Sequence, residues 1–122
     1  MAENKTYITQ TQENGSVMIS EDVISTIADH AIHEVEGFVA LSTKPGADIV
    51  DRIVKKNWGK GMKITIGEDD RLTVDCNVII AYGQSVVTVA QSIQETLTSA
   101  LESMTGVNVA SINVNVCGIA QQ

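Results

Sequence analysis

A chain of 122 residues with 43% hydrophobic and 19% charged residues fits one compact globular domain and excludes an intrinsically disordered protein. The net charge is −7, from 8 basic and 15 acidic residues. This balance argues against a nucleic-acid partner and against adhesion to an anionic membrane, because both need an excess of Lys and Arg.

The first 15 residues are polar, and we expect a flexible tail with at most a short extended piece around Tyr7 and Ile8. They carry no signal-peptide pattern, and no apolar run approaches the ~18 residues that span a bilayer. We therefore expect a cytoplasmic protein without direct membrane insertion, whose single domain covers residues 16–120.

The first half of this domain alternates between strand and helix patterns. Val17 and Ile19 indicate a brief strand, and Ser20 is a candidate N-cap for a helix that runs to about Val35 and closes at Gly37. A short strand over 38–41 follows, and then a second helix over 47–56.

The second half begins with two alternating apolar runs, over 62–66 and 72–80, which predict a β-hairpin joined by a polar turn. A long helix over 84–104 ends near Gly106, and a last strand follows. Its apolar pattern shifts by one residue at Ala110–Ser111, which indicates a bulge or a break. The predicted fold class is α+β: a small, mostly antiparallel sheet with about three helices packed on one face, in a single domain. The strand order is left open.

No catalytic or metal-binding pattern is present. His30 and His33 do not have zincin spacing, and the pairs Asp29/His33 and His30/Glu34 are better interpreted as surface charge pairs. No nucleophile elbow surrounds the serines of the long helix (Ser85, Ser92 and Ser99), and the acidic run 68–70 is typical of a solvated turn. We expect no enzyme activity, no metal and no cofactor.

Cys76 and Cys117 each lie in an apolar run without a CxxC motif or zinc-site spacing. Two buried or half-buried free thiols in a reducing compartment are the favoured interpretation, with a disulfide or a redox role as the alternative.

One charge feature stands out. A twelve-residue window without acids holds five of the eight basic residues, whereas the rest of the chain has 3 basic and 15 acidic residues, a net of −12. Together with a tryptophan and two glycines it forms the candidate partner or anion patch, which we call the basic window: Arg52, Lys55, Lys56, Trp58, Gly59, Lys60, Gly61 and Lys63. It fits an anionic partner with Trp58 as an anchor, or head-to-tail self-association with an acidic surface. A solvated lysine loop with Trp58 at the edge of the core is the alternative.

The order and spacing of several short motifs resemble the alkaline shock protein family of Gram-positive bacteria, also called the Gls or general-stress family. The match covers about residues 16–119, and its motifs are Val17-Met-Ile-Ser20-Glu-Asp-Val23-Ile, Ile27-Ala28, Glu34-Val35-Glu36-Gly37, Gly59-Lys60-Gly61, Tyr82-Gly83, the helix positions Ala90, Ile93 and Gln94, Met104-Thr105-Gly106 and Ile112-Asn113-Val114-Asn115-Val116.

This resemblance implies a non-enzymatic cytoplasmic protein of cell-envelope homeostasis and alkaline or general stress. Similar proteins can be held beneath the membrane by an anchored partner, and some self-assemble, so a homo-oligomer and a membrane-anchored or envelope-related protein partner are expected. The alternative is a regulatory module that binds an anionic small molecule or a lipid-metabolism enzyme, with Lys60 and Lys63 contacting the anion.

Overall fold

The computed structural model of the protein describes residues 7–42, 61–67 and 69–120. These described residues form eight elements, in the order β1 (Tyr7–Gln12), β2 (Gly15–Ser20), α1 (Glu21–Ile32), β3 (Phe38–Leu41), β4 (Met62–Ile66), β5 (Arg71–Ala81), α3 (Val86–Thr105) and β6 (Asn108–Ala120).

The main sheet is built around β5. β4 and β3 lie end to end along one side of β5 and are both antiparallel to it, whereas β6 lies on the other side and runs parallel to it. A parallel neighbour needs a crossover connection, which α3 supplies between β5 and β6. The register of β5 and β6 shifts at two places, one of them at the Ala110–Ser111 step, so the bulge expected there is confirmed.

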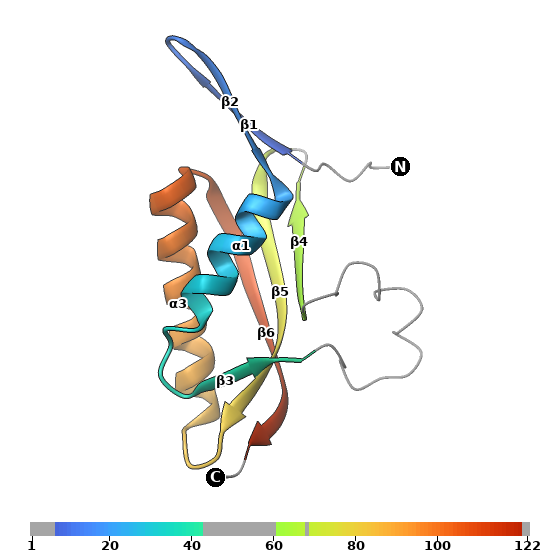
Figure 1. Ribbon diagram of the computed structural model, residues 1–122, viewed down its shortest axis with the longest axis vertical. Helices are drawn as coiled ribbons and strands as arrows, with labels where there is room; N and C mark the ends of the chain where they lie inside the picture. Colours follow the sequence, from blue (N-terminus) through green and yellow to red (C-terminus); the bar gives the residue numbers. More distant parts are fainter. Residues whose placement is uncertain (1–6, 43–60, 68, 121–122) are drawn as a thin grey trace, which may run out of the picture.

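Both helices pack on one face of this sheet (Figure 1). The alternating residues of β5 explain why: every second side chain is buried and apolar, from Leu72 to Ile80. These meet the buried stripe of α3, in which Ile93, Leu97 and Leu101 are inaccessible to solvent. The opposite face of β5 carries polar side chains from Arg71 to Asn77, followed by Ile79 and Ala81.

The helix ends use the residues that the sequence predicts. The Ser20 Oγ accepts a hydrogen bond from the Val23 N–H at 3.3 Å, and Gly106 ends α3 in the left-handed conformation with φ of 76°. Ser85, one of the serines screened as a nucleophile, is the N-cap of α3 and accepts from the Thr88 N–H at 3.4 Å.

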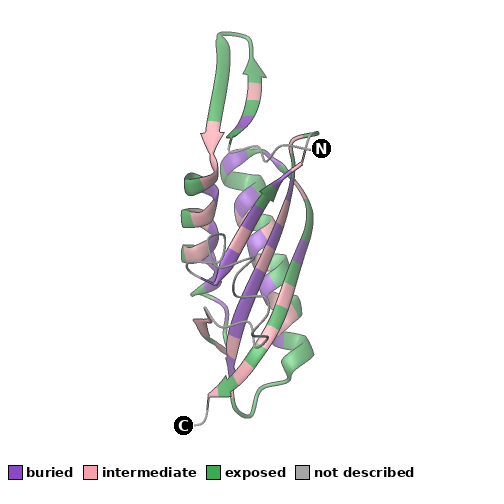
Figure 2. Ribbon diagram, turned by 90° about the vertical axis from the view of Figure 1, so that its right-hand side faces the viewer, coloured by how far each residue is buried: buried purple, intermediate pink, exposed green. Residues whose placement is uncertain are grey.

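Two expectations need correction. The described residues contain two helices rather than about three, and the expected helix over 47–56 lies outside them. The segment expected to be a flexible tail contains β1, which pairs along its whole length with β2. This two-stranded hairpin stands out from the end of the molecule, as Figures 1 and 2 both show. The mostly antiparallel sheet is confirmed, with β5 and β6 as its parallel pair.

Candidate functional site

The basic window lies between β3 and β4, and the structure describes two of its eight residues, Gly61 and Lys63. The other six lie outside the described residues, so the structure neither brings them together nor separates them. Lys63 is half-buried on β4 and lies directly across from Asp75 of β5, on the sheet face away from the helices. Gly61 immediately precedes β4.

The base of the window is a junction of three backbones. The Ser42 N–H donates to the Asn77 carbonyl at 2.8 Å, and the Asn77 N–H donates to the Gly61 carbonyl at 2.9 Å. One residue of β5 therefore holds both ends of the segment 43–60, where β3 stops and β4 starts. The approach is so close that a Cβ on Gly61 would lie 2.5 Å from the Ser42 carbonyl oxygen. Gly61 also has a φ of 81°, so only glycine fits here without strain.

On the other side of β5, hydrogen bonds between amide and carboxylate side chains connect β5 to β6. The Asn115 Nδ2 donates to the Asn77 Oδ1 at 3.1 Å, and the Asn113 Nδ2 donates to the Asp75 Oδ1 at 2.8 Å. Asn77 is only 1% exposed, and its Nδ2 has no hydrogen-bond partner within the described part of the chain. Sequence reasoning missed Asn77, although it is the one buried polar residue between the buried apolar positions Cys76 and Val78.

The two thiols have different environments. Cys76 is buried on the helix face of β5, and its burial, with a smaller contribution from the Asp75 charge, raises the pKa of its thiol to about 12. Cys117 is exposed on β6, contrary to the buried or half-buried position expected, although partial burial still raises the pKa of its thiol. Both are free thiols.

We expect an alkylating reagent to separate these cysteines. At pH 8, the Cys76 side chain would be a thiolate in about one protein molecule in ten thousand, and the core shields it from the reagent. Iodoacetamide followed by mass spectrometry of the native protein should therefore give a single adduct, at Cys117, and the second adduct only in denaturant. Rapid double modification without denaturant would contradict the burial of Cys76.

The residues screened for metal binding do not form a site. The His33 Nδ1 lies 2.7 Å from the Asp29 carbonyl oxygen and 3.9 Å from its carboxylate, which confirms that surface pair. The pair expected between His30 and Glu34 does not form. No group of three possible ligands exists within residues 7–42, 61–67 and 69–120.

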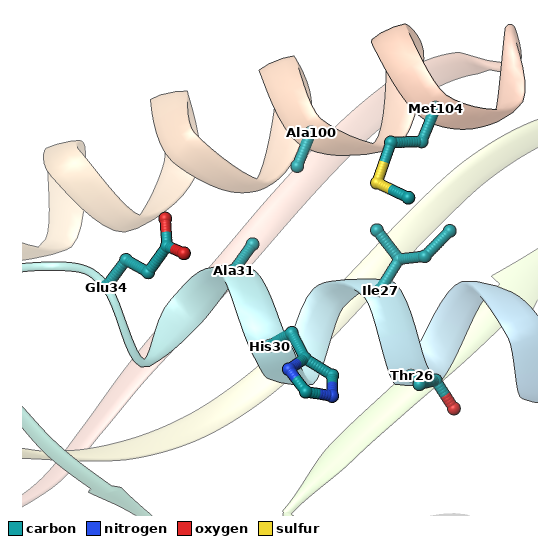
Figure 3. A pocket seen from close by; sticks show the side chains of 7 residues that line it. All are labelled: Thr26, Ile27, His30, Ala31, Glu34, Ala100 and Met104. Atoms are coloured by element: carbon teal, nitrogen blue, oxygen red, sulfur yellow. The ribbon is translucent and has the colours of Figure 1, made fainter.

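His30 and Glu34 instead border an apolar pocket between the two helices (Figure 3). The pocket has a volume of about 350 Å³, and Ile27, Ala31, Ala100 and Met104 form its apolar walls. The Met104 side chain is 67% exposed and hangs over the pocket from the last turn of α3. This surface is suited to contact with an apolar side chain rather than to acid–base chemistry.

The polar turn between β4 and β5 is also structural. The Asp69 Oδ1 accepts a hydrogen bond from the Arg71 N–H at 3.1 Å, and Asp70 has a φ of 62°, which turn residues such as aspartate tolerate. The Asp69 carboxylate and the left-handed backbone of Asp70 therefore help to shape the hairpin. No helix in the described ranges is long and apolar enough to cross a membrane.

Comparison with known proteins identifies relatives over nearly the whole chain. The profile of the alkaline shock protein 23 family, described by a cell envelope-related function, matches residues 9–121. The protein YqhY of Bacillus subtilis is 35% identical over 105 residues, which are 86% of this chain and 77% of YqhY. The protein Spy1535 of Streptococcus pyogenes is 35% identical over 112 residues, covering 92% of this chain and 84% of that protein.

A stress response regulator gls24 homolog of Streptococcus pyogenes is 25% identical over 122 residues, covering 94% of this chain and 68% of that protein. No solved structure matches the chain.

Proposed function

This chain belongs to the alkaline shock protein family, and on that premise we propose that it acts in the cell-envelope stress response as a non-enzymatic protein that associates with itself and docks onto an envelope-related partner. Membership of the family supports the envelope and stress context. The proposed mode of action goes further and depends on the surface of this particular chain.

The observation that carries the mode of action is the basic window on an acidic chain. Five basic residues within twelve positions face a remainder with a net charge of −12, so the window of one copy is complementary to the acidic surface of another copy. Ser42 and Gly61, which flank residues 43–60, are both fixed to the sheet at Asn77. Partner docking would use the same complementarity, with a membrane-anchored or envelope-related protein as the acidic partner and with the protein itself in the cytoplasm.

Light scattering on the purified protein tests the self-association. We expect the mass to rise from micromolar to hundreds of micromolar protein at low salt and to fall at high salt, because salt screens exposed charges. Lys60→Glu and Trp58→Ala should each shift the association to higher concentration. Arg71→Glu is the matched control, because it makes the same change of charge at an exposed residue outside the window.

A mass that stays fixed at that of a monomer or a dimer under all conditions would exclude concentration-dependent assembly. The result would then favour a docking module or the alternative, a regulatory module for an anionic ligand, in which a bound anion would raise the melting temperature through preferential binding to the folded state.

A further inference from the structure

The hairpin formed by β1 and β2 has little support from its own chain. Ile8 is buried at its root and the Gln10 Nε2 donates to the Thr105 carbonyl at 2.8 Å, but the remainder up to the tip is largely exposed on both sides. Val17 and Met18 are 49% and 59% exposed. An isolated two-stranded hairpin is only marginally stable in water. We call residues 9–18 the arm.

The second unsupported feature is the outer edge of β6. Within the described chain β6 pairs only with β5, and Figure 2 shows it as a largely exposed strand at the side of the sheet. Proteins usually guard such an edge with lysine, proline or inward-facing charges. β6 has none of these in its 13 residues, although its pairing with β5 is interrupted by two bulges.

Coverage of this edge changes along β6. Near its start, α3 supplies two side chains: a Glu102 carboxylate oxygen accepts from the Val109 N–H at 3.3 Å, and the Gln94 Nε2 donates to the Ile112 carbonyl at 3.0 Å. From residue 113 to residue 120, α3 makes no such hydrogen bond in the region that the structure describes. We call residues 113–120 the open edge.

Charge explains why the arm and the open edge suit each other. Residues 76–122 contain two charged residues, both acidic and both on α3, and residues 7–20 contain one, Glu13. Two copies of a chain with a net charge of −7 repel each other, so a contact through these two neutral surfaces keeps most of the acids away from the interface. Depletion of charge is also what distinguishes the centre of protein interfaces from the remaining surface.

We infer that the arm of one copy pairs, by β-strand addition, with the open edge of β6 in a second copy. The arm projects beyond the end of the molecule where β6 begins, and thus away from the open edge of its own chain (Figure 1). The arm contains four residues of each strand, 9–12 and 15–18, and the open edge has eight residues, so the arm fits within the length of the open edge.

Because the arm and the open edge are different surfaces, the contact is heterologous, and successive copies form a ring where the rotation between them closes and an open chain where it does not. This inference rests on the self-association proposed above and adds to it a neutral contact that salt does not screen. The experiment therefore uses high salt, at which contacts of the basic window are weakened.

Three double variants with the same added charge test this contact. The arm variant is Val17→Lys with Met18→Lys, the edge variant is Cys117→Lys with Ile119→Lys, and the control is Val23→Lys with Val39→Lys. All six positions are exposed. We expect the arm and edge variants each to need at least about tenfold more protein to associate, about 1.4 kcal/mol, while the control associates like the wild type.

Mixing gives the decisive result. An equimolar mixture of arm and edge variants retains one intact arm and one intact edge, so sedimentation should show complexes of two copies and nothing larger. A symmetric contact between two β6 edges would instead leave the arm variant fully competent and the mixture without rescue. That outcome would overturn the inference.

The wild type provides a second measurement in case a variant fails to fold. In associated protein, alkylation of Cys117 should slow as concentration rises, because the added strand covers the open edge. An unchanged rate in demonstrably associated protein would overturn the inference while leaving self-association in place. A wild type that is monomeric at every concentration and salt would overturn both.

Discussion

Replacing Gly61 with alanine is expected to lower the free energy of unfolding by about 2 kcal/mol or more. Part of this loss is backbone strain, since a φ of 81° costs a non-glycine residue on the order of 1 kcal/mol. The larger part is steric, because the new Cβ would lie 2.5 Å from the Ser42 carbonyl oxygen, and a backbone atom cannot rotate away as a side chain can. Relief requires β3 or β4 to shift away from Asn77.

Urea unfolding monitored by circular dichroism measures this effect, and Gly83→Ala is the matched control. Gly83 has a φ of 95°, but a Cβ there meets nothing within 4 Å. The Gly83→Ala variant therefore measures the cost of the backbone strain without a steric clash. Equal losses in the two variants would show that the contact between Gly61 and Ser42 carries no cost and that the junction is looser than the structure indicates.

The second large effect is expected for Asn77→Asp, which keeps the shape of the side chain and introduces an acid at a site that is 1% exposed. Burial should raise the pKa of this carboxyl in the folded state above its value of about 3.9 in the unfolded chain. Asn115 remains as a donor and offsets part of the cost. We expect a loss of about 3 kcal/mol at pH 7 relative to the wild type.

The sign of the pH dependence follows from that shift. Below about pH 3 the acid is neutral in both states and the variant should approach the stability of the wild type. As the pH rises, the unfolded chain ionises first, so the variant loses stability until the pH passes the folded pKa. Unfolding curves at several pH values test this, with the exposed Asn108→Asp as control. A loss that does not vary with pH would mean that the new carboxyl is not buried in the fold.

Much of the fold could be predicted because hydrophobic periodicity reports which side of an element is buried. The alternation over 72–80 and the helical spacing over 84–104 both correspond to observed elements, and the caps at Ser20 and Gly106 follow from local chemistry. An extended piece was expected only around Tyr7 and Ile8, and the full length of β1 was missed because Thr and Gln alternate with one another beyond Ile8, so no apolar face marks the strand. Its pairing with β2 comes from backbone hydrogen bonds, which leave no trace in hydropathy.

The arrangement of strands could not be predicted for a related reason. Alternation says which face a residue occupies and nothing about which strand lies beside it, so the parallel neighbour β6 was not foreseen. The basic window was found from charge alone, but its base was not, because Asn77 contacts Ser42 and Gly61 across large sequence separations. Asn77 lies among polar residues on its face of β5, so the sequence pattern does not distinguish it from an exposed asparagine.

The junction of Ser42, Asn77 and Gly61 has a consequence for how the sequences of such proteins can change during evolution. For a flexible loop with fixed ends, the entropy lost on closing the loop grows only with the logarithm of its length. On that basis, doubling the 18 residues between Ser42 and Gly61 would lower the free energy of unfolding by about 0.6 kcal/mol. Changes of length between Ser42 and Gly61 are therefore compatible with an unchanged junction at Asn77. Under the proposed function, recognition by the basic window can change in this way without a new fold.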